Sequence, residues 1–193
     1  MHDKIQMREW SRLTWHDPEE KLRKLRDVEF KVLDLDLPPD VRHLRTNELK
    51  PWNEARQAAL FAHGMREVLG TKVFLALHEA ADYDFVAHYR EGDAGHFCPV
   101  QLKEWVPPER NPEESLNDLL AKIARKYPTP TTTTVAIHVN NPGRLEFAGI
   151  EVPEISLGGL WLFGSKTTDQ SRWWLYGSLI HHPDLYEFRY PWP

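Results

Sequence analysis

The amino-acid sequence predicts a single α/β domain whose core runs in the order helix, three strands, helix, strand. Two segments repeat apolar residues at helical spacing, and the other core segments are short, rich in strand-forming residues and bounded by turns. The chain has 193 residues, of which 41% are hydrophobic, so it can build one domain with a sizeable core. We place the core at residues 53–139, an N-terminal addition at 1–50 and an aromatic-rich C-terminal addition at 145–193.

The first core helix is predicted over residues 53–69. Asn53 is a suitable N-cap, and apolar residues follow at intervals of three and four, as on one face of a helix. These apolar residues are Ala58, Phe61, Met65 and Val68. Glu54 precedes Ala58 by one helical turn, so it lies at the end of the same stripe. A continuous apolar run at 73–77 then predicts the first strand.

A hairpin supplies the second and third strands. The run 82–89 has the length and composition of a strand, and the segment 91–95 can close a turn to the next strand. Successive side chains of a strand point to opposite faces, so Gln101 and Lys103 share one face. The hairpin would bring Asp84 close to that face.

The second helix and fourth strand complete the core. Asn111 is a suitable N-cap, Pro112 suits the first turn, and Glu114 supplies an acidic third position. The apolar residues at helical spacing are Leu116, Leu119, Leu120, Ile123, Ala124 and Tyr127. The segment 131–139 is rich in β-branched residues and precedes a turn at 140–143, so we expect a strand there.

The two additions carry weaker signals. Residues 18–26 predict a short helix, and the alternation of apolar and charged residues over 28–37 predicts an edge strand that Pro38 ends. Two more strands are expected at 157–163 and 173–176.

The C-terminal part is rich in aromatic residues. They are Trp161, Trp173, Trp174, Tyr186, Phe188, Tyr190 and Trp192. Such rings could stack on unpaired bases or bury a homodimer interface. Packing of a second sheet layer is the simplest interpretation.

The element order and the polar residues on it resemble the PD-(D/E)xK nuclease superfamily, which has a restriction-endonuclease-like fold. The resemblance covers about residues 53–139. It makes Glu54 the acid of the first helix and Asp84 the metal ligand of the second strand. Gln101 and Lys103 occupy the two positions of the third-strand motif. The resemblance therefore implies a metal-dependent enzyme that hydrolyses phosphodiester bonds of nucleic acid.

The implied chemistry needs a hard divalent cation, magnesium or alternatively manganese. Asp84 and the amide oxygen of Gln101 would bind it with a backbone carbonyl and waters, and Glu54 would hold a metal-bound water or a second ion. Lys103 would orient the attacking water and stabilise charge in the transition state, while the metal lowers the pKa of the water.

The chain departs from the family pattern at two positions. Gln101 stands where most members have an acid, which removes a negative charge, and Tyr83 replaces the proline before the aspartate. Glu79 and Asp82 are nearby carboxylates that could replace the missing charge, and Asp82 would share a strand face with Asp84. The Gln101 replacement keeps open a second interpretation, in which the domain has lost catalysis and acts as a binding or assembly module. A structural protein is a third interpretation.

Composition limits the remaining choices. The formal charge of -5 argues against a protein that coats nucleic acid, but a nuclease needs only a local basic surface. Lys122, Arg125 and Lys126 on the second helix could bind substrate. Cys98 is the only cysteine, so neither a disulfide nor a cysteine-based zinc site can form within the chain. With no apolar run long enough to span a membrane, we expect a cytoplasmic protein without a membrane partner.

Overall fold

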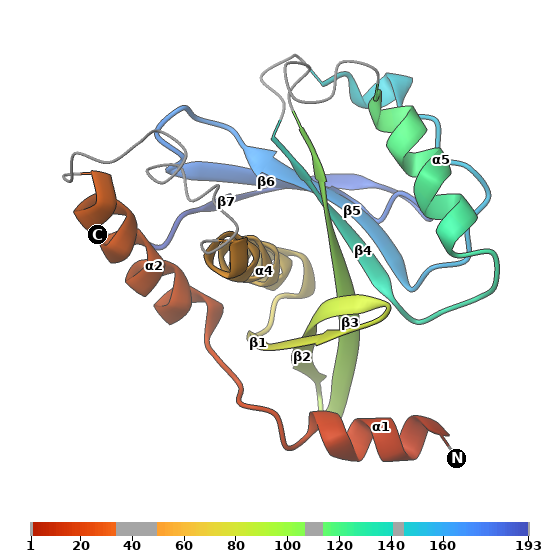
Figure 1. The fold of residues 1–193 in the computed structure, drawn as a ribbon, viewed down its shortest axis with the longest axis horizontal. Helices are drawn as coiled ribbons and strands as arrows, with labels where there is room; N and C mark the ends of the chain where they lie inside the picture. The colour runs from red at the N-terminus through yellow and green to blue at the C-terminus, as the bar shows by residue number, and fades with distance from the viewer. Residues whose placement is uncertain (1, 34–49, 107–113, 141–144, 193) are drawn as a thin grey trace.

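The computed structural model describes residues 2–33, 50–106, 114–140 and 145–192, which form an α/β fold around one seven-stranded sheet (Figure 1). The strands lie side by side in chain order, from β1 to β7. They are β1 (Val73–Ala80), β2 (Tyr83–Glu91), β3 (Ala94–Trp105), β4 (Thr134–Val139), β5 (Gly159–Ser165), β6 (Arg172–Gly177) and β7 (Asp184–Arg189). The pairs β3–β4 and β4–β5 are parallel, and the other neighbouring pairs are antiparallel. The predicted α/β class is therefore confirmed.

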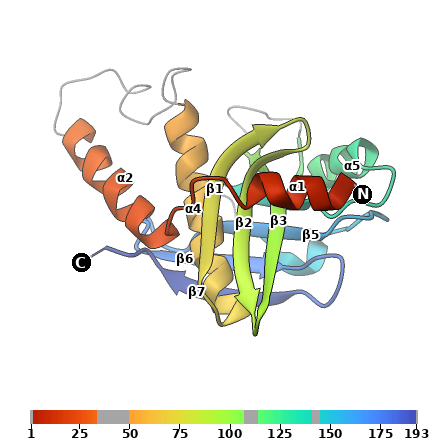
Figure 2. The same cartoon turned by 90° about the horizontal axis from the view of Figure 1, so that it is seen from below.

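Helices cover both faces of this sheet (Figure 1). They are α1 (His2–Trp10), α2 (Pro18–Leu33), α4 (Lys50–Leu69) and α5 (Leu116–Lys126), with a short 3-10 helix η1 (Phe147–Gly149). α4 and α2 lie on one face, α5 lies on the other, and α1 crosses β2 and β3 (Figure 2). The order α4, β1, β2, β3, α5, β4 is the order of elements predicted for the core.

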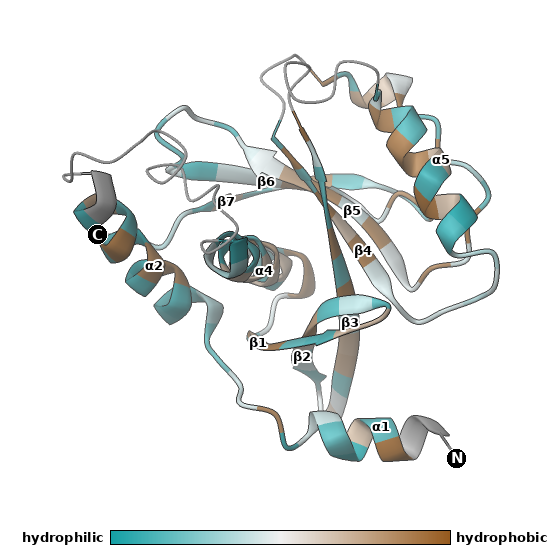
Figure 3. Ribbon diagram, in the orientation of Figure 1, coloured by the Kyte–Doolittle hydropathy of each residue, from teal (hydrophilic) through white to brown (hydrophobic). Residues whose placement is uncertain are grey.

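The alternation of side chains along the central strands supplies two hydrophobic cores. In β4, Ala136 packs in the core on the α4 side, while Val135 and Ile137 pack in the core on the α5 side. β4 and β5 are accordingly hydrophobic over most of their length in the middle of the sheet (Figure 3). Strands that bury both faces need such composition, and their parallel pairing fits that requirement.

The β2–β3 hairpin forms as predicted, with a turn at Gly92. Its φ of +57° lies in the left-handed region, which glycine adopts without a steric cost. The register pairs Phe85 with Val100. Asp84 and Gln101 are the next positions on the two strands, and opposing residues of an antiparallel pair point to the same face.

The predicted strand at 28–37 is wrong for residues 28–33, which belong to α2; residues 34–37 lie outside the described part of the chain. Leu22 and Leu25 lie one helical turn apart and are buried. Glu29 bonds to Arg26 three positions earlier, a pairing that a helix places on one face. The alternation of apolar and charged residues was compatible with both structures, and these packing and charge contacts favour the helix.

Both predicted helix starts need correction. α4 is already helical at Lys50, so Asn53 lies within it and is not the N-cap; Pro51 fits the first turn, where a missing N–H costs nothing. α5 begins at Leu116, and Ser115 is its N-cap. Ser115 Oγ accepts from Asp118 N, and the Asp118 carboxylate accepts from Ser115 N. The N-cap predicted at position 111 lies outside the described residues.

The predicted second sheet layer is wrong, because the C-terminal strands β5, β6 and β7 extend the same sheet. Neither β7 nor α1 was predicted. Most aromatic rings of the C-terminal part take part in packing within the domain. Trp161, Trp173, Phe188 and Tyr190 are buried in the core on the α4 side. They are therefore not available to stack on bases, whereas Trp192 is exposed.

Arg56 joins α4 to α2, to the β5–β6 connection and to two aromatic rings, although its side chain is buried. Its Nε lies 2.7 Å from Glu29 Oε1 of α2. Its Nη2 donates to the side chain of Gln170 between β5 and β6, and its guanidinium lies over the rings of Trp173 and Tyr190. The ion pair, the hydrogen bond and the ring contacts together help to offset the loss of hydration of this buried guanidinium.

His138 of β4 lies in a neighbouring buried polar cluster. Its ring stacks with those of Phe163 and Trp173, and its Nδ1 lies 3.3 Å from Gln57 Nε2. Burial lowers the pKa of His138 from its ordinary value, and the bond to Glu104 opposes that shift. His138 is therefore neutral inside the fold at neutral pH.

Candidate functional site

Asp84 of β2 and Gln101 of β3 meet where the β2–β3 ladder ends. Gln101 Nε2 donates to Asp84 Oδ2, and the backbone N of Leu102 donates to the same oxygen at 2.5 Å. The carboxylate thus takes the place that a backbone carbonyl would hold if the ladder continued. The structure confirms the predicted proximity of Asp84 and Gln101, and it fixes Asp84 with charge-assisted bonds.

The other end of the Gln101 side chain contacts α5. Lys126 lies in the last turn of that helix, and its Nζ donates to Gln101 Oε1 at 2.9 Å. Lys126, Gln101 and Asp84 therefore form one hydrogen-bonded chain, which we call the amide bridge. The sequence indicated Lys126 as a weak substrate-binding residue, but it did not indicate this contact.

Lys103 lies beside the amide bridge, two positions beyond Gln101 on the same strand face. Burial lowers the pKa of Lys103 from its ordinary value, the ammonium of Lys126 lowers it further, and the carboxylate of Asp84 opposes both effects. Lys103 is thus an electrostatic neighbour of both Asp84 and Lys126. This side of the site is positively charged, because two ammonium groups face one carboxylate that is already hydrogen-bonded.

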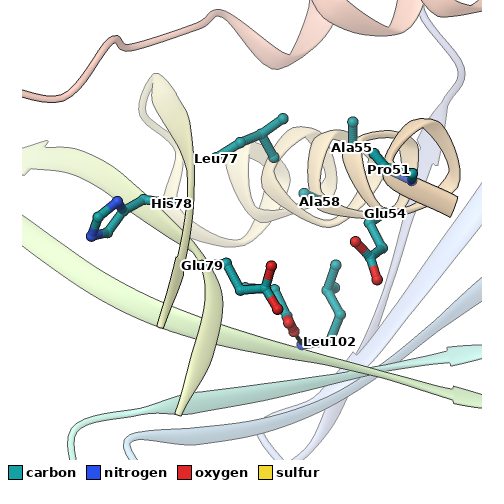
Figure 4. A pocket seen from close by; sticks show the side chains of 9 residues that line it. Pro51, Glu54, Ala55, Ala58, Leu77, His78, Glu79 and Leu102 are labelled. Atoms are coloured by element: carbon teal, nitrogen blue, oxygen red, sulfur yellow. Dashed lines mark hydrogen bonds between the residues drawn. The ribbon is translucent and has the colours of Figure 1, made fainter. Parts of the chain in front are cut away.

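A pocket of about 200 Å³ opens on the other side of Asp84, between the start of α4 and the end of β1 (Figure 4). Its lining comprises Pro51, Glu54, Ala55, Ala58, Leu77, His78, Glu79, Asp84 and Leu102. Figure 4 shows the carboxylates of Glu54 and Glu79 turned into the space between α4 and the strands. This side of the site is negatively charged, because its carboxylates outnumber the cationic groups that line it.

Glu54 lies where the helical stripe predicted it, on the same pocket as Asp84. Its Oε1 is 3.4 Å from Lys50 Nζ, and its side chain retains 41% exposure. A half-exposed carboxylate of this kind can turn toward the pocket or toward its lysine neighbour at little cost.

Of the two carboxylates proposed to replace the missing charge, Glu79 lines the pocket and Asp82 does not. The expectation that Asp82 shares a strand face with Asp84 is wrong, because β2 begins at Tyr83 and Asp82 lies in the tight turn after β1. The side chain of Asp82 is exposed. When two strands are joined by such a short turn, the sequence pattern does not determine to within one residue where the second strand begins.

The described residues contain no group of three or more His, Cys, Asp or Glu side chains arranged to hold a metal ion. Glu54, Glu79 and Asp84 line one pocket without forming a complete ligand shell. Magnesium is usually held by one or two carboxylates and several waters, so these carboxylates are donors of the kind that it takes. The oxygen of Gln101, in contrast, is bonded to Lys126.

The predicted basic residues of α5 do not form one surface toward the site. Lys122 Nζ lies 2.5 Å from Glu114 Oε1, so this lysine is paired at the other end of the helix. Arg125 is exposed to solvent, and Lys126 alone of the three contacts the site.

Comparisons with known proteins leave the family unassigned. No protein-family model matches the chain, and no curated protein or solved structure matches it either. Within the described ranges, no helix has the length and apolar character that a membrane span requires.

Proposed function

We propose that the protein is a metal-dependent nuclease with a restriction-endonuclease-like core, which hydrolyses phosphodiester bonds of nucleic acid. The observation that carries the proposal is the position of Asp84, between an acidic pocket and a pair of lysines. A phosphodiester bound to a divalent cation needs carboxylates on one side and cationic donors on the other. The helix, three strands, helix, strand order of the described core supports the same family.

Residues Glu54, Glu79 and Asp84 would hold magnesium or manganese in this proposal, with waters in the remaining positions. When bound, the cation lowers the pKa of a water and offsets the charge of the phosphate. Lys103 donates to the phosphate or orients the water, and its lowered pKa brings proton transfer closer to neutral pH. Glu79 thereby supplies the charge that Gln101 lacks.

The test is cleavage of single- and double-stranded DNA and RNA by purified protein with magnesium or manganese. Asp84→Ala and Lys103→Ala should each abolish metal-dependent cleavage. Lys122→Ala is the matched control, because this lysine is paired with Glu114 away from the pocket. Circular dichroism confirms that each variant is folded. Cleavage that survives in folded Asp84→Ala protein would refute the proposal.

The second candidate function is a binding or assembly module with the same fold. The bonded amide of Gln101 and the incomplete ligand shell favour it. It predicts no cleavage of any of the four substrates, no gain of activity in Gln101→Glu, and nucleic-acid binding that does not depend on a divalent cation.

A further inference from the structure

The two neighbours of Gln101 fix the orientation of its side-chain amide. The Lys126 ammonium has only donors, so it must face the amide oxygen, and the distance between them is 2.9 Å. The Asp84 carboxylate has only acceptors when ionised, so it must face the amide NH₂. The opposite orientation would set donor against donor at one end and acceptor against acceptor at the other.

This orientation is unfavourable for a cation on Oδ2 of Asp84, the oxygen that accepts from Gln101 Nε2. A divalent cation there would meet the NH₂ of Gln101 rather than its oxygen, and NH₂ cannot ligate a metal. For the oxygen to serve, the amide must turn over, and its NH₂ then faces the ammonium of Lys126. Two donors cannot bond to each other, so the ammonium must move away.

We propose that Lys126 is a positioning residue that holds Gln101 in the cation-excluding orientation, so that cation binding at Asp84 and the Lys126–Gln101 bond compete. The proposal rests on the proposed function only in requiring a divalent cation at Asp84. Lys126 lies at the end of α5 with an exposed side chain, so it has room to move when the amide turns. Its released ammonium is then beside Lys103, where the phosphate would bind.

The experiment measures manganese affinity without nucleic acid, by electron paramagnetic resonance and calorimetry. Lys126→Met keeps the alkyl length and removes the donors. It should bind manganese about tenfold more tightly than the unsubstituted protein, because a hydrogen bond to a charged group no longer opposes the amide turn. Lys122→Met, one turn earlier on the same helix, should stay within about twofold of the unsubstituted protein because the affected charge is distant and screened.

A double-mutant cycle separates the amide bridge from simple repulsion between charges. Gln101→Met removes the amide, so Lys126→Met in that background should change the affinity by about twofold at most, as expected from screened repulsion alone. An equal factor in both backgrounds would show that only repulsion acts and would overturn the proposal.

The remaining outcomes are also decisive. Manganese binding that is equal in Lys126→Met and unsubstituted protein overturns the role of Lys126 and leaves the proposed nuclease site standing. No manganese binding in any of the proteins overturns the cation site itself, and the role of Lys126 with it. Lys126→Leu, which also has no hydrogen-bond donor, provides a second variant if Lys126→Met does not fold.

Discussion

Replacing Gln101 by glutamate should convert a stable apo site into one that depends on a divalent cation. The substitution removes the NH₂ that donates to Asp84 and puts a second carboxylate in its place. The lost hydrogen bond to a charged group is worth about 1.5–3 kcal/mol. Two carboxylates about 4 Å apart repel by about 4 kcal/mol at an effective dielectric constant of about 20, before solvent screening.

Two effects reduce this cost. Lys126, which already contacts the oxygen of Gln101, gains an ion pair of about 1 kcal/mol with the new carboxylate. The half-buried position of Asp84 lets water screen much of the repulsion. We therefore expect a net loss of about 2 kcal/mol in the free energy of unfolding at neutral pH without metal.

Urea denaturation in EDTA and in manganese measures this difference. A cation at a concentration of about 100 times its dissociation constant adds about 2.7 kcal/mol of stability, which should restore Gln101→Glu to at least the apo stability of the unsubstituted protein. Gln101→Met is the control, because it loses the hydrogen bond without adding charge and should gain less from manganese. A Gln101→Glu variant that is fully stable in EDTA and gains nothing from manganese would refute the reasoning.

Three further predictions concern stability. Gly64→Ala should destabilise the protein by about 1–3 kcal/mol in thermal or urea denaturation, because the new Cβ would lie 2.3 Å from Leu175 Cδ1. Alanine is the better helix former, so a stabilised variant would contradict this clash. Ser115→Ala should cost about 1 kcal/mol through the lost N-cap bond to Asp118 N, whereas Ser115→Asp should retain most of it. The pKa of His138 is lowered in the folded protein, so the unfolded chain binds a proton more readily. The free energy of unfolding should therefore decrease as the pH falls below 6.5, the ordinary pKa of histidine, and it should decrease less in His138→Gln.

Short-range sequence patterns predicted the β2–β3 hairpin and the positions of the polar side chains on it and on α4. The β2–β3 hairpin follows from a glycine at the turn and from strand-forming residues on both sides. Once that hairpin is set, strand alternation alone brings Asp84 to Gln101. The apolar stripe of α4 likewise placed Glu54 on the pocket, even though the helix begins earlier than its apparent N-cap.

Long-range contacts determined what the sequence did not predict. The contact of Lys126 with Gln101 joins the last turn of a helix to a strand 25 residues earlier, and no local pattern reports which helix face meets which strand. The residues 28–33 alternate as a strand would, yet they belong to α2, and Glu29 of that helix bonds to Arg56 far along the chain. Asp82 lies one residue before the start of β2, whereas Asp84 lies within the strand and lines the pocket.

The buried guanidinium of Arg56 makes the N-terminal region part of the stabilising interior of the domain. Its counter-ion, Glu29, is supplied by α2, which precedes every strand of the sheet. A chain trimmed to begin at α4 would keep all seven strands but would leave this cation without its carboxylate, at a cost of about 3–5 kcal/mol for a broken buried pair. That is a large fraction of the stability of a typical domain. The sequence pattern changes near residue 50, but the buried ion pair joins a carboxylate before that boundary to a guanidinium after it.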